Sequence, residues 1–291
     1  MSTLLRKVKA RLFLTSPRRS AHPLEGAHAA VLRGRSLDFD DLRVYQPGDE
    51  VRDIDWRASA RSNQVLIKRY IATRRQVVSL TLDTGVTMDA RATDGTRKRD
   101  LALLIAGVLG YLSLRHGDEV GTRFATETGL HRQRGATSEG RLELALRGAR
   151  DRVAGAEFTR ERLLDSIVRE ERGRRILTII TDETPIGDAE ERQLRRLRVQ
   201  HDLVWITVCE APLLETARDT PVDVQTGWAV PTFARSDTAL IEELARADAA
   251  ERERRIALLN ALSITNQEIR TEAEVVPTLL DMLRRKHRAR R

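Results

Sequence analysis

From residue 76 onward, short apolar segments alternate with longer segments whose apolar residues recur at helical spacing. The apolar segments predict strands at Val77 to Asp83, Asp118 to Ala125, Arg175 to Asp182, Asp202 to Cys209 and Ser263 to Ile269. The remaining segments predict helices at 97–114, 138–150, 160–170, 188–199, 237–262 and 273–285, with a hairpin-like excursion near Gly129. Strands that alternate with helices of this length form crossover connections, which place helices on both faces of a parallel sheet. The sequence therefore predicts an α/β fold with a doubly wound, mostly parallel sheet.

The composition is that of a folded protein with an aliphatic core. Hydrophobic residues make up 41% of the 291 residues and aromatic residues only 4%, so Leu, Val, Ile and Ala must fill the interior. The longest apolar run, Leu101 to Leu114, is shorter than the roughly 20 residues that span a bilayer, and it predicts a buried helix. The N-terminus carries charge but no sustained apolar segment of the signal-peptide kind, so we expect a cytoplasmic protein.

The change of pattern near residue 76 divides the chain into an N-terminal region, 1–75, and an α/β domain, 76–288. The N-terminal region begins with a predicted short amphipathic helix whose apolar residues are Leu4, Leu5, Val8 and Leu12. Such a helix either lies on a membrane surface or docks on the rest of the protein, and docking is the prediction here. We therefore expect a smaller region of strand and loop that packs on the main domain.

Residues 43–61 carry more charge than a loop needs. Four acids and four arginines are interleaved around Trp56, with a turn signal at Pro47-Gly48. Charges removed from water must be paired and hydrogen-bonded, so the segment is either a solvated ribbon or a specific ion-pair clamp, and Trp56 favours the clamp. The functional alternative makes the same surface a docking face for a partner. In the clamp, ion pairs fix the N-terminal region on the sheet domain and Trp56 is the buried apolar plug. The residues of this clamp or docking face are Tyr45, Asp49, Arg52, Asp55, Trp56 and Arg61.

A series of short motifs runs from Arg33 to Met88. Its members are Gly34-Arg35, Asp38-Phe39, Asp41-Leu42-Arg43, Tyr45, Pro47-Gly48-Asp49, Arg52, Ile54-Asp55-Trp56, Ser59-Ala60-Arg61 and Asp83 to Met88. In this order and spacing, the motifs resemble the bacterial domain-of-unknown-function family 58. The resemblance implies that a von Willebrand factor A-like domain, with a degenerate metal-ion-dependent adhesion site, follows the N-terminal segment.

Two aspartates mark one edge of the predicted sheet. Asp83 and Asp182 each end a strand, and ligands of open α/β sheets bind at the carboxyl ends of the strands. The resemblance implies a divalent cation held by Asp83, Thr87 and Asp182. Gly85 stands in place of the first hydroxyl ligand, and Thr137 is the candidate for a loop threonine. Mg²⁺ or Mn²⁺ is the expected ion, because Mg²⁺ keeps waters where protein ligands are missing. The alternative is that Thr87 caps a turn and Asp182 caps the following helix.

The sequence gives no support for catalysis. Cys209 lies inside an apolar strand with no histidine nearby, and the six histidines lack metal-ligand spacing. Neighbouring arginines keep Asp49, Asp53 and Asp55 ionised, which argues against acid–base chemistry. We therefore expect a protein that is not an enzyme.

Two classes of partner remain open. The family resemblance implies a scaffold protein that binds a MoxR-type AAA+ ATPase and serves the assembly or maturation of other proteins. The alternative is a basic adaptor that binds nucleic acid or an anionic membrane surface, because the net charge is +8 and arginines are dense at both ends. The 43 acids scattered among the arginines weaken this alternative.

Overall fold

The computed structural model describes residues 4–15, 38–71, 76–126, 129–150, 159–211 and 237–288. Its main feature is a six-stranded sheet in the order β5-β4-β3-β6-β7-β8. The strands are β3 (Val77–Leu82), β4 (Glu119–Thr126), β5 (Gly129–Ala136), β6 (Ile176–Thr181), β7 (Asp202–Val208) and β8 (Thr265–Ile269). All neighbours are parallel except β5, which runs antiparallel to β4 at one edge. The predicted doubly wound, mostly parallel sheet is confirmed.

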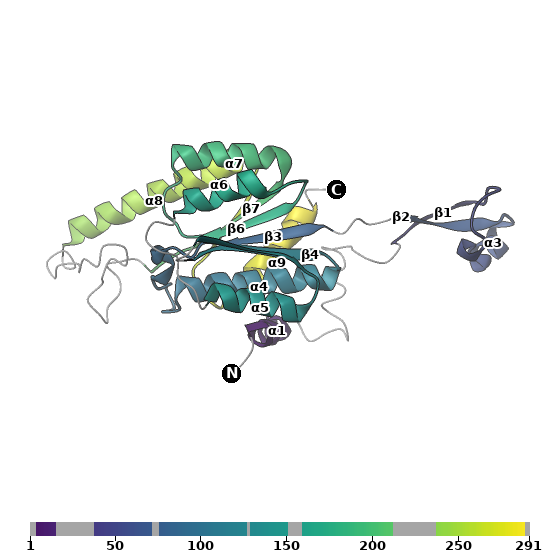
Figure 1. The fold of residues 1–291 in the computed structure, drawn as a ribbon, viewed down its shortest axis with the longest axis horizontal. Coiled ribbons are helices and arrows are strands. Elements are labelled where there is room, and N and C mark those ends of the chain that lie inside the picture. The colour runs from purple at the N-terminus through teal and green to yellow at the C-terminus, as the bar shows by residue number, and fades with distance from the viewer. Residues whose placement is uncertain are drawn as a thin grey trace.

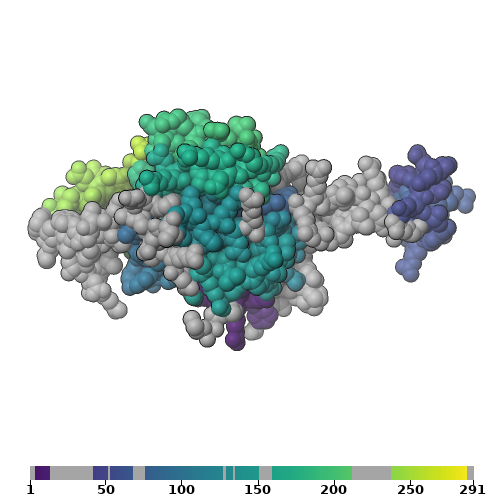
Figure 2. Space-filling model, viewed as in Figure 1, coloured from purple at the N-terminus to yellow at the C-terminus, as the bar shows by residue number. Residues whose placement is uncertain are grey.

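Helices cover both faces of this sheet (Figure 1). One face carries α1 (Leu4–Thr15), α4 (Lys98–His116), α5 (Glu139–Arg150) and α9 (Val275–Arg288). The other face carries α6 (Arg160–Glu170), α7 (Asp188–Gln200) and α8 (Thr238–Ala261). In Figure 2 the side chains of α6 and α7 form a continuous green layer over the second face.

The central strands contribute side chains to two separate hydrophobic cores, because successive side chains of a strand point to opposite faces of the sheet. In β7, Val204 and Ile206 enter the core beneath α4, whereas Leu203 and Trp205 enter the core beneath α6 and α7. Both faces are therefore buried, which explains why these strands read as continuous apolar runs rather than as alternating ones.

Helix α4 is the most deeply buried helix of the described chain. It corresponds to the apolar run Leu101 to Leu114, and it packs against α1, α5, α9 and the sheet. Gly107 allows close approach of α1, since a Cβ at this position would lie 2.8 Å from Val8 Cγ2. Among the helices that the structure describes, none is long and apolar enough to cross a membrane.

Helix α1 docks on this face as predicted. Leu5, Val8 and Leu12 are at most 5% exposed and belong to the same core as α4 and α9. Although α1 lies within residues 1–75, its packing makes it part of the α/β domain.

The rest of the described N-terminal region forms a small unit, which we call the N-terminal module (residues 38–71). It contains β1 (Asp38–Val44), the 3-10 helix η1 (Val51–Asp53), α3 (Trp56–Ser62) and β2 (Leu66–Ile71), and β1 pairs antiparallel with β2. Ser59 joins the helix to the strand, because its Oγ accepts from the backbone N–H of Leu66 at 2.8 Å. The substantial contacts of these elements are with one another (Figure 1).

Candidate functional site

Asp83 follows β3 at the carboxyl edge of the sheet and is 9% exposed. Its Oδ2 accepts a hydrogen bond of 2.7 Å from Thr181 Oγ1, and its Oδ1 accepts one of 2.9 Å from the backbone N–H of Gly85. Burial raises the pKa of Asp83, and the nearby charge of Asp182 raises it further. The carboxylate is thus held by hydrogen bonds in a place that disfavours its charge.

Asp182 follows β6 at the same edge and is 3% exposed. Thr184 donates to both of its oxygens, from the backbone N–H to Oδ1 at 3.1 Å and from the hydroxyl to Oδ2 at 2.8 Å. Burial opposes its ionisation, but the charges of Lys98 and Arg160 and the hydrogen bonds of Thr87 and Thr184 outweigh burial and lower the pKa of Asp182. Asp182 is therefore a stable carboxylate.

Arg160, the first residue of α6, approaches Asp182 from one face of the sheet. Its Nη1 lies 3.4 Å from Asp182 Oδ1. Its Nε and Nη2 each donate to one oxygen of Glu190 at 2.8 Å, and further bonds reach the carbonyl oxygens of Thr184 and Pro185. The guanidinium is 5.4 Å from the ring centre of Trp205, a cation–π contact. Arg160 is only 8% exposed and is fixed on several sides.

Lys98, the first residue of α4, brings a second cation from the opposite face. Its side chain is 1% exposed, and its Nζ lies 2.9 Å from Glu183 Oε2 and 3.6 Å from Glu210 Oε2. Burial favours the neutral amine, but the charges of Glu183 and Asp182 outweigh burial and raise the pKa of Lys98. Lys98 is therefore a buried ammonium group.

Three of the four predicted cation ligands lie together, and the fourth does not. Thr87 donates a hydrogen bond to Asp182. Asp83 lies beside Asp182 because the two residues follow the ends of neighbouring parallel strands, β3 and β6. Thr137 was the wrong choice because β5 is antiparallel: it follows Ala136, which pairs with Val120 at the start of β4. Asp83 lies near the other end of β4, because it follows Leu82, which pairs with Phe124, and this places it roughly 15–20 Å away at the rise of a strand.

The residues at this edge do not fit a divalent cation. Each of the four carboxylate oxygens of Asp83 and Asp182 accepts a hydrogen bond from a protein donor, so a cation would compete with these donors. A guanidinium nitrogen stands 3.4 Å from Asp182, where Mg²⁺ would require oxygen ligands at about 2.1 Å. In the described parts of the chain, no group of three or more His, Cys, Asp or Glu residues is arranged to hold a metal.

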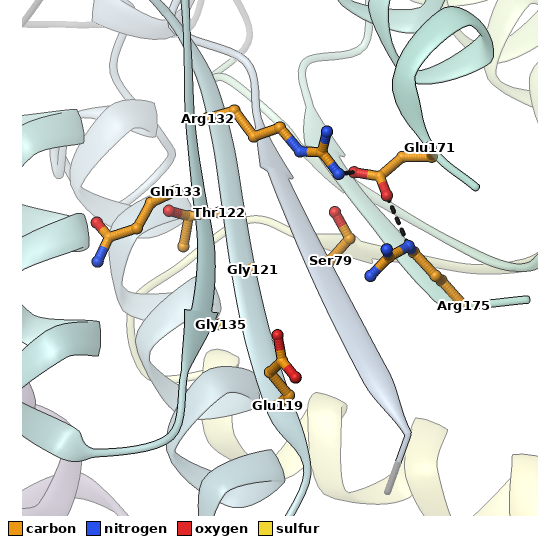
Figure 3. A pocket seen from close by; sticks show the side chains of 9 residues that line it. All are labelled: Ser79, Glu119, Gly121, Thr122, Arg132, Gln133, Gly135, Glu171 and Arg175. Atoms are coloured by element: carbon orange, nitrogen blue, oxygen red, sulfur yellow. Dashed lines mark ion pairs between the residues drawn. The ribbon is translucent and has the colours of Figure 1, made fainter. Parts of the chain in front are cut away.

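A second polar cluster lies on the α6 face of the sheet and is organised by Glu171. Figure 3 shows Arg132 and Arg175 directed at this carboxylate, and the ion pairs measure 2.9 and 2.6 Å. Arg123, which is 1% exposed, adds a third pair of 3.1 Å. A cavity of about 50 Å³ beside the cluster has room for a few water molecules. Three arginines around one buried carboxylate serve to join β4, β5 and α6.

The predicted clamp between domains is wrong. Trp56 is 64% exposed, and α3, which begins with it, has no buried residue. Asp49 pairs instead with Arg43 inside the N-terminal module, at 2.7 Å, and the hydrogen bonds from Arg43 and from the Gln46 N–H lower the pKa of Asp49. Asp55 caps α3, accepting from the backbone N–H groups of residues 57 and 58. The charges are satisfied locally, so they do not require the sheet domain.

The other residues of the predicted clamp are spread over the module. Tyr45 is half-buried and pairs its backbone N–H with Val65 at 2.8 Å, and Arg61 is exposed in the last turn of α3. The Arg52 side chain lies outside the described part of the structure. These positions do not converge on one site.

Two remaining predictions concern Cys209 and the basic ends. Cys209 is a core side chain, and burial raises the pKa of its thiol to about 11, which leaves it a poor nucleophile at neutral pH. Lys7 and Arg11 both pair with Glu272, and Lys286 pairs with Asp202 at 3.1 Å. Several charges of the basic ends therefore serve the packing of α1 and α9. Residues 289–291 lie outside the described chain.

Comparison with known proteins gives one family and several distant folds. The family model described as protein of unknown function DUF58 matches residues 41–254. "Uncharacterized protein Rv1480" of Mycobacterium tuberculosis and "Uncharacterized protein Mb1516" of Mycobacterium bovis are each 30% identical to this chain over 236 residues, covering 79% of this chain and 73% of theirs.

Two solved structures are similar to this chain at low sequence identity. The conserved hypothetical protein BatB from Bacteroides thetaiotaomicron is 13% identical, with a TM-score of 0.43, and the match covers 73% of this chain and 99% of that one. The von Willebrand factor type A structure from Catenulispora acidiphila is also 13% identical, with a TM-score of 0.41, covering 75% of this chain and 43% of that one. At these TM-scores the likeness carries no argument about function.

Proposed function

This chain belongs to the family of proteins of unknown function DUF58, and we propose that it acts as a non-enzymatic scaffold that binds another protein. The observation that carries the proposal is the surface of the N-terminal module. Four of the eight large hydrophobic side chains that are exposed in the described chain belong to this module, namely Val44, Val51, Trp56 and Val65. This share of exposed apolar side chains in so small a unit supports a surface for protein contact.

The chemistry of the carboxyl edge supports a scaffold rather than an enzyme. Asp182 is held as a carboxylate by Lys98 and Arg160, and the two cations are themselves paired with glutamates. A general acid or base needs a pKa near the working pH, and a nucleophile needs an adjacent base. The ion pairs of Asp182, Lys98 and Arg160 supply neither.

The proposed partner is a MoxR-type AAA+ ATPase, which the family resemblance implies, and the proposed role is the assembly or maturation of other proteins. Trp56 is the residue of the module most suited to anchor such a partner, because tryptophan is enriched among residues that dominate binding energy. In the structure its side chain is largely exposed at the start of α3.

Co-purification of the full chain with a MoxR-type ATPase from the same organism tests the proposal. Trp56→Ala should weaken the complex by about 2 kcal/mol or more, roughly 30-fold in Kd, which isothermal titration calorimetry measures. Phe13→Ala is the matched control, since Phe13 is a 77% exposed aromatic residue on α1, outside the module. Equal binding by the native chain and both variants would exclude Trp56 as the anchor, and no binding by any of them would exclude this partner.

A further inference from the structure

The carboxylate pair at the carboxyl edge faces two cations that belong to the protein itself. Arg160 begins α6 and Lys98 begins α4, and these helices lie on opposite faces of the sheet. Asp83 and Asp182 end neighbouring parallel strands, so the two cations approach the pair from both sides. The helix starts also direct backbone N–H groups and the positive ends of their dipoles toward this edge.

We infer that Arg160 and Lys98 are built-in counter-ions of the carboxylate pair, and that this edge of the sheet is complete without a divalent cation. This counter-ion role does not depend on whether the proposed ATPase binds to the N-terminal module.

Arg160 is fixed in place, so it cannot move aside for an ion. Five hydrogen bonds hold its guanidinium, two of them to Glu190 and one each to Asp182, Thr184 and Pro185. Glu190 is itself anchored, because its Oε2 accepts from the backbone N–H of Gly187 at 3.0 Å. An ion that displaced Arg160 would break this whole network and leave a buried carboxylate without its partner.

Lys98 is fixed in the same way on the other face. Glu183 holds the ammonium group through Oε2, while its Oε1 accepts from the backbone N–H of Glu210 at 2.9 Å. Arg255 binds the carbonyl oxygen of Glu183 at 2.7 Å, which ties the same loop to α8. A dication placed between the aspartates would therefore face two immobile positive charges.

Metal titration of the full chain tests the inference directly. After dialysis against EDTA, calorimetric titration with MgCl₂ or MnCl₂ should give no saturable heat, and 10 mM of either salt should shift Tm no more than NaCl of equal ionic strength. A Kd below 1 mM would instead raise Tm by several degrees through mass action. Saturable binding that Asp83→Asn abolishes would overturn the inference.

Removal of the internal charge gives the converse test. The variant Arg160→Gln/Glu190→Gln deletes both members of the buried pair, so no unpaired charge remains at position 190 while the two aspartates lose one counter-ion. It should acquire a Tm increase of several degrees with Mg²⁺. Arg195→Gln, which alters an exposed pair on α7, is the control and should stay insensitive to Mg²⁺. Lys98→Met makes the same test from the other face if the double variant does not fold. A folded charge-deleted variant that remains insensitive to Mg²⁺ would overturn the counter-ion role.

Discussion

Arg160 and Glu190 form a buried ion pair whose two side chains are 6% and 11% exposed. The charges at this edge were only partly predictable. Asp83 and Asp182 could be assigned from the sequence, because each directly follows an apolar strand and parallel strands end at a common edge. Arg160 could not, because its partners lie 22 and 30 residues away and nothing local distinguishes it from 45 other arginines. Lys98 was missed for the same reason.

Arg160→Ala should lower the free energy of unfolding by about 3–5 kcal/mol, because it leaves Glu190 as an unpaired buried charge. Urea unfolding followed by circular dichroism measures the loss. Arg195→Ala breaks a pair of the same type on α7 that is 59% and 31% exposed, and should cost less than about 1 kcal/mol. If the two variants lost similar free energies of unfolding, burial would not be the reason why the Arg160 pair stabilises the protein.

His201, at the end of α7, should make stability fall in mild acid. It is 2% exposed, and its ring nitrogens have no hydrogen-bond partner in the described chain. Burial lowers its pKa, with the charge of Arg175 in the same direction and that of Glu171 opposing it. The pKa of His201 in the folded protein therefore lies below its unfolded value of about 6.5, and folding favours the neutral ring. The contribution of the neutral ring to stability is complete above the unfolded pKa, and it is lost as pH falls through the folded pKa.

The measurement is urea unfolding of the native chain and of His201→Gln at pH 7.5 and pH 5.0. The native chain should lose more stability between the two pH values than the variant does. If both lose the same amount, His201 is not the residue that titrates.

At the scale of elements, the apolar pattern was sufficient for the sheet. The helix predicted at 160–170 is α6, Arg160–Glu170, and the strand predicted at 175–182 is β6, Ile176–Thr181. The hairpin-like excursion predicted near Gly129 is the antiparallel pair of β4 and β5. The return strand itself was not predictable, because half of its residues are polar and its pairing depends on tertiary contact. The error at Thr137 follows from the antiparallel direction of β5. The position of α1 on α4 depends on Gly107. A glycine inside a predicted helix indicates close packing, but the sequence does not show which element packs against it.

Gly107→Ala should destabilise the protein, although alanine favours a helix over glycine by about 1 kcal/mol. Its Cβ would lie 2.8 Å from Val8 Cγ2, and Val8 is a stiff side chain that is 1% exposed. We expect a net loss of about 1 kcal/mol in urea unfolding, after a packing cost of about 1–3 kcal/mol. Gly140→Ala is the control in α5, where no atom lies within 4 Å, and should be neutral or stabilising.

Pairing Gly107→Ala with Val8→Ala identifies the contact. The double variant should be more stable than the sum of the two single losses implies, because the smaller side chain removes the overlap. If the losses of the two single variants simply added in the double variant, the strain of Gly107→Ala would not arise from its contact with Val8.

At the scale of the whole molecule, the described chain divides by packing rather than by sequence order. Helix α1 shares a core with α4 and α9, whereas the N-terminal module between α1 and β3 is built on its own contacts. Residues 1–75 were predicted to form one region on the main domain. The described residues of this region instead form two parts, the docked helix α1 and the separate N-terminal module. A charge pattern alone could not show this, because local ion pairs and interdomain ion pairs use the same residue types.

Deletion of residues 38–71 should leave the thermal unfolding of the α/β domain within about 2 °C of the native value, since neither hydrophobic core includes a residue of the module. Differential scanning calorimetry measures the transition, and the far-UV spectrum checks that the helices remain. Loss of the cooperative transition would mean that the module stabilises the domain after all.

The packing of α1 against α9 has a consequence for biosynthesis. Lys7 and Arg11 of α1 form ion pairs with Glu272, in the turn just before α9, across 265 and 261 positions of the chain. During translation α1 leaves the ribosome first, but the residues that complete its binding site leave among the last described. Until then Leu5, Val8 and Leu12 have only part of their native cover. Part of the apolar face of α1 therefore stays uncovered until α9 has been synthesised, and we expect the nascent chain to bind chaperones that hold apolar segments.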